Sequence, residues 1–323
     1  MPPYILAVDL GGTQIRAALC DPSGQVFKRA ARATKAQEGL AAVLARIALT
    51  IEEAAEGVAE ESIAGIGIGA PGPLDPMTGT ILAAPNLPGW INVPLRNLVS
   101  ARFGKRTFLG NDANLAGLAE ATYGAARGIS DVVYLTISTG IGSGIIVDGR
   151  LLLGSRGLAA EAGHTIIDPD GPKCGCGNNG CIESFAAGPA ITRDVVGRLK
   201  AGKSSKLTKL SGGDLSKVDT RMINEAAQAG DKLAVNAFRR AGSYLGLGIV
   251  NLLHLFNPRM VVLGGSVTKA GPLLFDPMWE TIRAKAMPPY LEGLAIVPAA
   301  LSDDVGLLGA LALAATELKI ERC

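Results

Sequence analysis

Residues 4–19 read YILAVDLGGTQIRAAL, and this stretch decides the fold. Tyr4–Asp9 is an apolar run of strand type that ends at a pair of glycines, and Ile15–Leu19 is a second apolar run. Short apolar runs bounded by glycine turns are typical of buried strands. The stretch therefore predicts a strand, a glycine turn and a second strand within an α/β domain.

A similar pattern occurs near the middle of the chain. Val132–Ile137 is apolar, residues 139–144 read TGIGSG, and Ile145–Val147 continues the apolar run. A repeated strand–turn–strand pattern indicates an imperfect internal duplication. We therefore expect two similar α/β domains, each presenting one glycine turn to the same ligand.

The composition limits the class of protein. A chain of 323 residues is long enough for two domains, and its net charge of +2 and 4% aromatic content lack the basic and aromatic surface of a nucleic-acid binder. Three of the five cysteines cluster within 174–181, which indicates a reducing compartment. The apolar segments Leu245–Phe256 and Val305–Thr316 are too short for membrane spans, and no signal-peptide pattern is visible. We expect a cytoplasmic protein with no nucleic-acid and no membrane partner.

The cysteine cluster has the composition of a zinc site. Residues 174–181 read CGCGNNGC and follow shortly after His164. Three thiols and one imidazole are ligands that tetrahedral zinc prefers, whereas the first two thiols are too close in sequence to form an easy disulfide. Four protein ligands close the coordination sphere, so we expect a structural rather than a hydrolytic zinc ion. Glu161 and Glu183 flank these ligands, and the metal would fix both carboxylates in space.

The two glycine turns suit phosphate groups. Gly11, Gly12 and Thr13 offer backbone N–H groups and a hydroxyl, while Asp9 lies where a nucleotide-bound Mg²⁺ could be held directly or through water. An ordinary β-hairpin turn is the alternative for either turn alone. Neither turn is a P-loop or a GxGxxG fingerprint, which argues against a NAD-linked dehydrogenase. Two such turns in one chain favour a nucleotide site.

Asn111 and Asp112 precede a predicted helix, Ala113–Thr122. They are favoured N-cap residues, which is one interpretation. The other is a general base at the helix start, where the helix dipole keeps a carboxylate ionised. Both can hold, with Asn111 positioning a hydroxyl whose proton Asp112 accepts.

Three other segments carry no chemistry in this interpretation. His254 lies in an apolar helical run and is expected to be a packed core residue. The polar stretch Lys200–Ser216 is expected to be an exposed connection, and residues 302–304 could cap the C-terminal helix.

With these motifs the chain resembles the ROK family of sugar kinases and related repressors, within the actin-like and hexokinase-like ATPases. The resemblance extends from Asp9 to the C-terminal helix. It rests on DLGGT (9–13), NDAN (111–114), TGIGSGII (139–146), EAGH (161–164), CGCGNNGCIES (174–184) and GGS (264–266).

The resemblance implies a fold of class α/β. Two actin/hexokinase-like (ribonuclease H-like) α/β domains would flank a cleft, with the zinc loop in the larger domain. The smaller domain would comprise 1–112, joined by a C-terminal helix at about 304–323. The larger domain would comprise 113–303 and carry the zinc-binding loop 164–183.

The resemblance also assigns roles position by position. The catalytic base would be Asp112. The sugar ligands would be Gly72, Asn86, Asn111, Asp112, Glu161, His164 and Glu183. The ATP-binding residues would be Asp9, Gly11, Gly12, Thr13, Thr139, Gly140, Gly264 and Gly265. The zinc ligands would be His164, Cys174, Cys176 and Cys181. Many members have Lys, Gly and Gly where this chain has Gln14, Ser138 and Ala160, and none of these departures removes an assigned group.

The implied activity is ATP-dependent phosphorylation of a hexose, foremost glucose at its 6-hydroxyl, with ATP, Mg²⁺ and structural Zn²⁺, in a homodimer. Mannose, fructose, N-acetylmannosamine and N-acetylglucosamine stay open as substrates. A sugar-sensing regulator of the same family is the other alternative. Such regulators carry a winged helix before the DxGGT motif, whereas eight residues precede Asp9 here.

Overall fold

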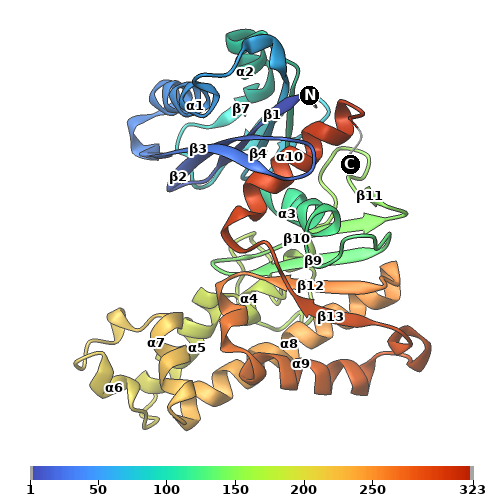
Figure 1. Cartoon of the computed structure of the whole chain (residues 1–323). Coiled ribbons are helices and arrows are strands. Elements are labelled where there is room, and N and C mark those ends of the chain that lie inside the picture. Colours follow the sequence, from blue (N-terminus) through green and yellow to red (C-terminus); the bar gives the residue numbers. More distant parts are fainter. Residues whose placement is uncertain (1–2, 321–323) are drawn as a thin grey trace. The chain divides into compact units, whose positions relative to one another are not determined.

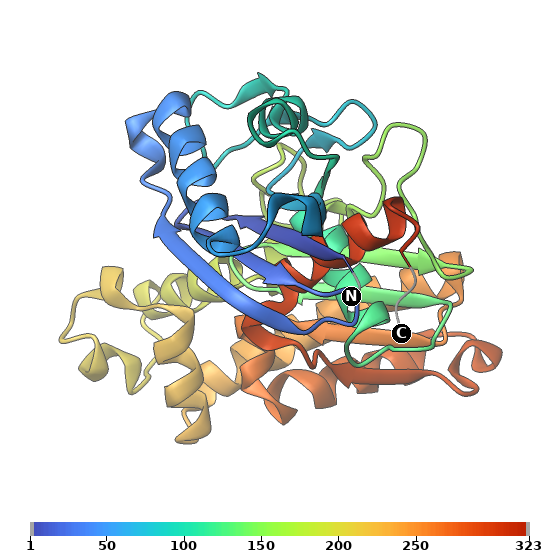
Figure 2. The ribbon, with the colours of Figure 1, turned by 45° about the horizontal axis from the view of Figure 1, so that its top comes forward.

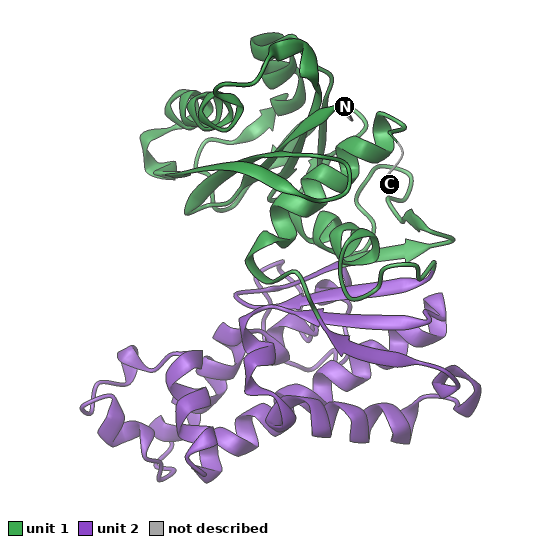
Figure 3. Ribbon diagram, in the orientation of Figure 1, with its two compact units in different colours: residues 1–130, 144–160, 299–323 green, residues 131–143, 161–298 purple. Residues whose placement is uncertain are grey.

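The computed structural model describes residues 3–320. The chain forms two compact units, coloured separately in Figure 3. Unit 1 is built from residues up to 130, from 144–160 and from 299 onward, and unit 2 from 131–143 and 161–298. The domain boundary expected after residue 112 stays a prediction.

Unit 1 contains the sheet that the opening stretch predicts. Its strand order is β3-β2-β1-β4-β8. The strands are β1 (Tyr4–Leu10), β2 (Gln14–Cys20), β3 (Val26–Ala33), β4 (Ile63–Ala70) and β8 (Thr107–Asn111). The first three form an antiparallel meander, and β4 runs parallel to both β1 and β8. The predicted strand, glycine turn and strand at residues 4–19 are therefore present.

Both faces of this sheet are covered by helices, as Figures 1 and 2 show. Successive side chains of a strand point to opposite faces. Leu6 and Val8 of β1 accordingly lie in one core with α1 (Leu40–Ala55), whereas Ile5 and Ala7 lie in the other with α10 (Val305–Glu317). The uninterrupted apolar run of β1 is explained by burial on both faces.

The remaining elements of unit 1 extend this framework. Helix α3 (Asp112–Thr122) follows β8 directly and packs against α10. A small antiparallel sheet and one helix lie between β4 and β8 in sequence, namely β5 (Leu74–Asp75), β6 (Thr80–Ala83), β7 (Ile91–Val93) and α2 (Leu95–Phe103). Trp90 and Leu87 are almost completely buried beside them and anchor the loop 84–90.

The second large sheet repeats the arrangement of the first. Its order is β11-β10-β9-β12-β13, with strands β9 (Val132–Ile137), β10 (Ile141–Val147), β11 (Arg150–Leu151), β12 (Met260–Gly264) and β13 (Ala295–Pro298). In each sheet the chain enters at the central strand, turns at the predicted glycines into the adjacent strand, and later adds parallel strands on the other side. This correspondence agrees with the duplication inferred from the sequence.

Unit 2 carries most of the helices. They are α4 (Glu183–Ala186), α5 (Gly188–Lys200), α6 (Leu207–Leu210), α7 (Thr220–Gln228), α8 (Lys232–Phe256) and α9 (Pro272–Lys285). Within the described residues, none of the helices combines the length and hydrophobicity that a bilayer span requires.

Three local predictions are corrected by the structure. Asp304 occupies the N-cap position of α10, but its side chain makes no cap bond, and its carboxylate instead pairs with Arg29, with 2.9 Å between Nη2 and Oδ2. His254 is half-buried rather than a core residue; its Nε2 accepts a 3.3 Å hydrogen bond from the N–H of Met287. The connection after α5 contains the short helix α6, whose Leu207 is fully buried.

Candidate functional site

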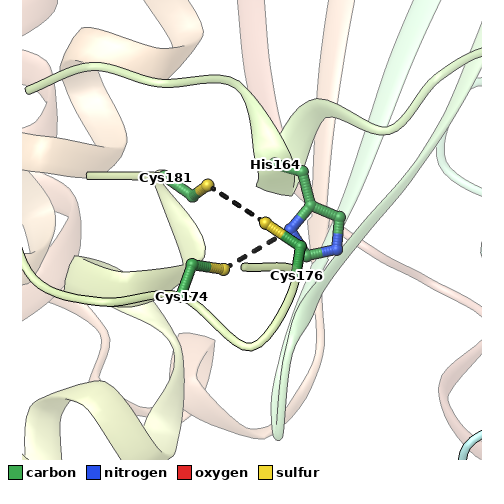
Figure 4. Close-up of side chains that lie close together, drawn as sticks. All are labelled: His164, Cys174, Cys176 and Cys181. Carbon is green, nitrogen blue, oxygen red and sulfur yellow. Dashed lines mark hydrogen bonds between the residues drawn. The ribbon is translucent and has the colours of Figure 1, made fainter. Parts of the chain in front are cut away.

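The four zinc ligands expected from the sequence lie together in unit 2. Figure 4 shows three thiols and the imidazole of His164 facing a common centre. Cys174 Sγ lies 3.6 Å from His164 Nδ1, and Cys176 Sγ lies 3.6 Å from Cys181 Sγ. All four ligand atoms lie within 4.8 Å of one another. A tetrahedral zinc ion with Zn–S bonds of about 2.3 Å spaces its sulfurs about 3.8 Å apart, so the donor set and its geometry fit this metal.

The thiols of the cluster differ in their acidity. Burial raises the pKa of Cys181 to about 12 and also raises that of Cys174. The N–H of Asn178 is the main cause that lowers the pKa of Cys176. Zinc binds thiolates, so a metal at this cluster would displace thiol protons.

Glu183 connects the cluster to the second glycine turn. Its Oε1 lies 3.7 Å from Cys174 Sγ, and its Oε2 accepts a 2.9 Å hydrogen bond from the N–H of Ile141. A Cβ placed on Gly140 would lie 2.6 Å from the same Oε2, so a side chain there would displace the carboxylate. Glu183 therefore holds the turn at 139–141 against the zinc loop, a contact that sequence reasoning did not predict.

Glu161 lies three residues before the ligand His164. It directly precedes the 3-10 helix η3 (Ala162–His164), and its side chain is exposed. The residue before it, Ala160, has a φ of 68°, a left-handed conformation that favours glycine. The departure from glycine at Ala160 therefore falls at a position whose backbone favours glycine.

A cavity of about 580 Å³ opens beside the second glycine turn. Its lining includes Ser138, Thr139, Gly188, Thr192, Thr220 and Ser266. Ser138 Oγ and Ser266 Oγ lie 3.1 Å apart, and the N–H of Gly188 donates to the carbonyl of Ser138 at 2.8 Å. Gly265 has a φ of 91°, and a Cβ there would lie 2.2 Å from the carbonyl oxygen of Ile137. The structure thus brings the turns at 138–140 and 264–266 together around one hollow. The contributions of α5 and α7 were missed, because no short motif marks them.

Unit 1 holds the other half of the expected residues. Asn111 Oδ1 accepts hydrogen bonds from the N–H groups of Ala113 (3.0 Å) and Asn114 (3.1 Å), which confirms its expected N-cap position at α3. A Cβ on Gly72 would lie 3.0 Å from Asn111 Nδ2, so this loop lies directly beside the amide. The side chain of Asp112 is exposed in the first turn of α3.

The first glycine turn is a tight hairpin end. The N–H of Gly11 donates to the carbonyl of Gln14 at 2.9 Å, and Thr13 is exposed. A Cβ on Gly12 would lie 2.9 Å from the Cβ of Asn86, so the loop that carries Asn86 lies against this turn.

Asp9 at the end of β1 pairs with a partner that sequence reasoning missed. Its Oδ2 accepts hydrogen bonds from Arg16 Nε, at 3.1 Å, and from Arg16 Nη2. The β1–β2 register places the two residues directly opposite each other. The sequence did contain a signal for this pair. Arg16 is the charged residue in the second apolar strand, and counting along the hairpin places it opposite Asp9. Arg16 binds Oδ2 and leaves Oδ1 of the carboxylate without a hydrogen bond among the described residues.

Comparison with known proteins identifies relatives over nearly the whole chain. The model of the ROK family matches residues 5–317. A glucokinase of Thermotoga maritima is 39% identical over 95% of this chain and 95% of its own length, and a xylose repressor of Caldicellulosiruptor bescii is 32% identical over 97% of this chain and 78% of its own.

Solved structures agree with these relatives. A ROK hexokinase from Thermus thermophilus superimposes with a TM-score of 0.82 at 37% identity, covering 98% of this chain and 100% of its own. A ROK family glucokinase from Streptomyces griseus, solved with glucose and AMPPNP, gives a TM-score of 0.80 at 34% identity, covering 96% of this chain and 98% of its own.

Proposed function

This chain belongs to the ROK family, and from that premise we propose that it is an ATP-dependent hexose kinase that phosphorylates glucose at the 6-hydroxyl. The glucokinase relatives match this chain and their own length almost equally, at 95% of each for the Thermotoga maritima protein. The observation that carries the proposal is the exposed carboxylate of Asp112 in the first turn of α3, beside Asn111.

In the proposed reaction Asp112 is the general base. A positive helix N-terminus favours its ionised form, which accepts the proton of the sugar hydroxyl as the γ-phosphoryl group is transferred. Asn111 cannot rotate freely because its Oδ1 holds two N–H groups of α3, so its Nδ2 is aimed by the helix itself. Asn111 with Gly72 and Asn86 would bind sugar hydroxyls from unit 1, and Glu161, His164 and Glu183 from unit 2.

The proposed phosphate contacts follow the two glycine turns. Gly11, Gly12 and Thr13 in unit 1 and Thr139 and Gly140 in unit 2 would donate to phosphate oxygens. Gly264 and Gly265 would line the adenosine side of the hollow near Ser138. Asp9 Oδ1 would hold Mg²⁺ directly or through water, and the metal, when bound, would offset phosphate charge.

The proposed role of zinc is structural. His164, Cys174, Cys176 and Cys181 would hold the ion and leave it no open coordination position. When bound, it would crosslink η3 to the loop that precedes Glu183. The protein residues, not the metal, would contact the sugar. We also propose a homodimer, as is usual in the family, and a cytoplasmic location, which the cysteine content favours.

A sugar-sensing regulator is the second candidate, since xylose repressors are among the relatives. The chain spans 78% of the length of the repressor from Caldicellulosiruptor bescii and 95% of the glucokinase from Thermotoga maritima. The higher identity to the glucokinase, 39% against 32% for the repressor, supports the kinase.

A coupled ADP-release assay tests the proposal. The purified protein is supplied with ATP and Mg²⁺ and with glucose, mannose, fructose, N-acetylmannosamine or N-acetylglucosamine in turn. We expect ADP release that depends on sugar, with the highest kcat/KM for glucose. A higher kcat/KM for another sugar would support kinase activity with that sugar, rather than glucose, as the substrate. Sugar binding by calorimetry without any ADP release would favour the regulator.

A further inference from the structure

A hollow of about 270 Å³ in unit 2 is surrounded by positive charge. Its lining consists of Arg198, Lys203, Ser204, Lys232, Leu233, Asn236 and Arg240. We call these seven residues the basic hollow. Four of them are cationic and none is acidic, although the whole chain has a net charge of only +2. The hollow shares no residue with the sites assigned above.

The cations come from two distant segments, and a buried carboxylate holds these segments together. Asp231, which is 5% exposed, caps α8 by accepting a 3.0 Å hydrogen bond from the N–H of Ala234. Its Oδ2 also accepts from Ser205 Oγ at 2.9 Å and from the N–H of Lys206 at 2.7 Å. The loop after α5 is thereby fixed against the start of α8, which places Lys203 near Lys232.

The positive charge of the basic hollow is only partly neutralised. Asp194 lies next to it and shares its carboxylate between two arginines, with 2.9 Å from Arg198 Nε to Oδ1 and a second bond from Arg240 to Oδ2. Within residues 3–320, Lys203 and Lys232 form no ion pair. Four cations therefore face two carboxylates, those of Asp194 and the buried Asp231.

An ordinary solvated face of lysines does not account for this arrangement. The side chains of Arg198 and Arg240 are 41% and 33% exposed, so protein atoms cover more than half of each side chain. Asp194 holds both arginines from one side and leaves their remaining N–H groups for a second acceptor. Ser204 and Asn236 add neutral hydrogen-bonding groups to the same wall.

We propose that the basic hollow binds a small multivalent phosphate. Guanidinium groups match phosphate oxygens in pairs, and lysines add point charges that favour more than one negative charge on the ligand. The ligand is either a free oligophosphate or the phosphate group of a small metabolite. The proposal does not depend on the kinase activity.

The test follows hydrogen exchange in the full-length protein, since this readout locates the ligand. Tripolyphosphate, glucose 6-phosphate and sulfate are each added at constant ionic strength. We expect tripolyphosphate or glucose 6-phosphate to protect amides within 198–206 and 232–236. Stronger binding of tripolyphosphate identifies a free oligophosphate, and stronger binding of glucose 6-phosphate identifies a phosphate ester. Equal protection by sulfate, or no protection of these segments by millimolar tripolyphosphate, would overturn the proposal.

A pair of double variants tests the residues. Lys203→Gln with Lys232→Gln removes two exposed cations of the basic hollow, and we expect the affinity for the preferred phosphate to fall at least tenfold. Lys209→Gln with Lys217→Gln removes the same charge from exposed positions of unit 2 outside it, and we expect a change below twofold. Equal losses in both variants would show non-specific attraction and would contradict the assignment. All four lysines are exposed, so melting temperatures should match the parent protein and confirm folding.

Discussion

At the residue scale, two neighbouring side chains at the start of α3 divide their work. Asn111 Oδ1 accepts hydrogen bonds from two backbone N–H groups, which fixes the amide, whereas the side chain of Asp112 is exposed. The sequence left two interpretations of this pair open, an N-cap and a general base. The structure confirms the cap, and the base stays a proposal.

Replacing Asp112 tests that proposal. Asp112→Asn keeps the shape of the side chain but removes its basicity. We expect kcat to fall about 10²–10⁴-fold, the usual contribution of a general base, with the dissociation constant for glucose within twofold. ADP release measures kcat, and calorimetry measures the dissociation constant for glucose. Asp276→Asn, an exposed aspartate on α9, is the control and should keep full turnover. Turnover within fivefold of the parent in Asp112→Asn would exclude this base.

The zinc cluster gives a second residue-scale prediction. Cys176 is exposed, so Cys176→Ser removes a ligand without opening the core. We expect less than half of the zinc of the parent by elemental analysis. Because Glu183 contacts both Cys174 and the N–H of Ile141, we also expect glucose affinity to weaken at least fivefold. Cys20→Ala, a cysteine outside the cluster, should keep its zinc. Loss of zinc with unchanged glucose affinity would show that the metal does not position the groups that bind the sugar.

At the element scale, short loops are held in place by single buried groups. Asp231 joins the start of α8 to the loop after α5 through bonds to Ala234, Ser205 and Lys206. Burial alone would raise its pKa, but the hydrogen bonds from Ala234, Lys206 and Ser205 lower it below the usual 3.8. A polar stretch that the sequence presents as a bare connection is therefore an ordered element.

Asp231→Ala should lower the free energy of unfolding by about 2–3 kcal/mol at pH 7, since a cap and two further acceptors are lost. The folded-state pKa is depressed, so the stabilisation is present above about pH 4 and is lost as the pH falls through the folded pKa. The difference between parent and variant in urea unfolding should therefore shrink below about pH 4. Asp219→Ala, which removes the cap of α7 alone, should cost about 1 kcal/mol. Equal losses in both variants would show that Asp231 acts as a cap only.

At the scale of the whole molecule, the two large sheets have corresponding strand orders. The first strand of each sheet in the chain, β1 or β9, is its central strand. The proposed sugar ligands are divided between the units, with Asn111 and Asp112 in unit 1 and Glu161, His164 and Glu183 in unit 2. If both proposed sets of ligands bind the sugar, each unit should respond to glucose.

Hydrogen exchange with saturating glucose tests this requirement. We expect slower exchange both in 111–114 and in 161–164, whereas the amides of β3, which carries none of the assigned residues, should be unchanged. In the variant Asn111→Ala, the same glucose concentration should protect both segments less. Protection confined to one unit would contradict a site formed by both.

The sequence by itself determined the features that depend on neighbouring residues. The apolar runs around residues 4–19 and 132–147 predicted both hairpins, because strand formation and glycine turns are local properties. The zinc ligands were predictable for a similar reason. Three of them lie within eight residues, and the glycines between them allow so short a loop to fold back on itself.

Tertiary structure alone decided the contacts between segments that are distant in sequence. The bond from Glu183 to the N–H of Ile141 and the convergence of Arg198 with Arg240 depend on how helices pack, and no short motif encodes this. The net charge of +2 gave no sign of the basic hollow, because a sum over the chain carries no information about position. Local patterns determine which elements form, and long-range packing decides which side chains meet.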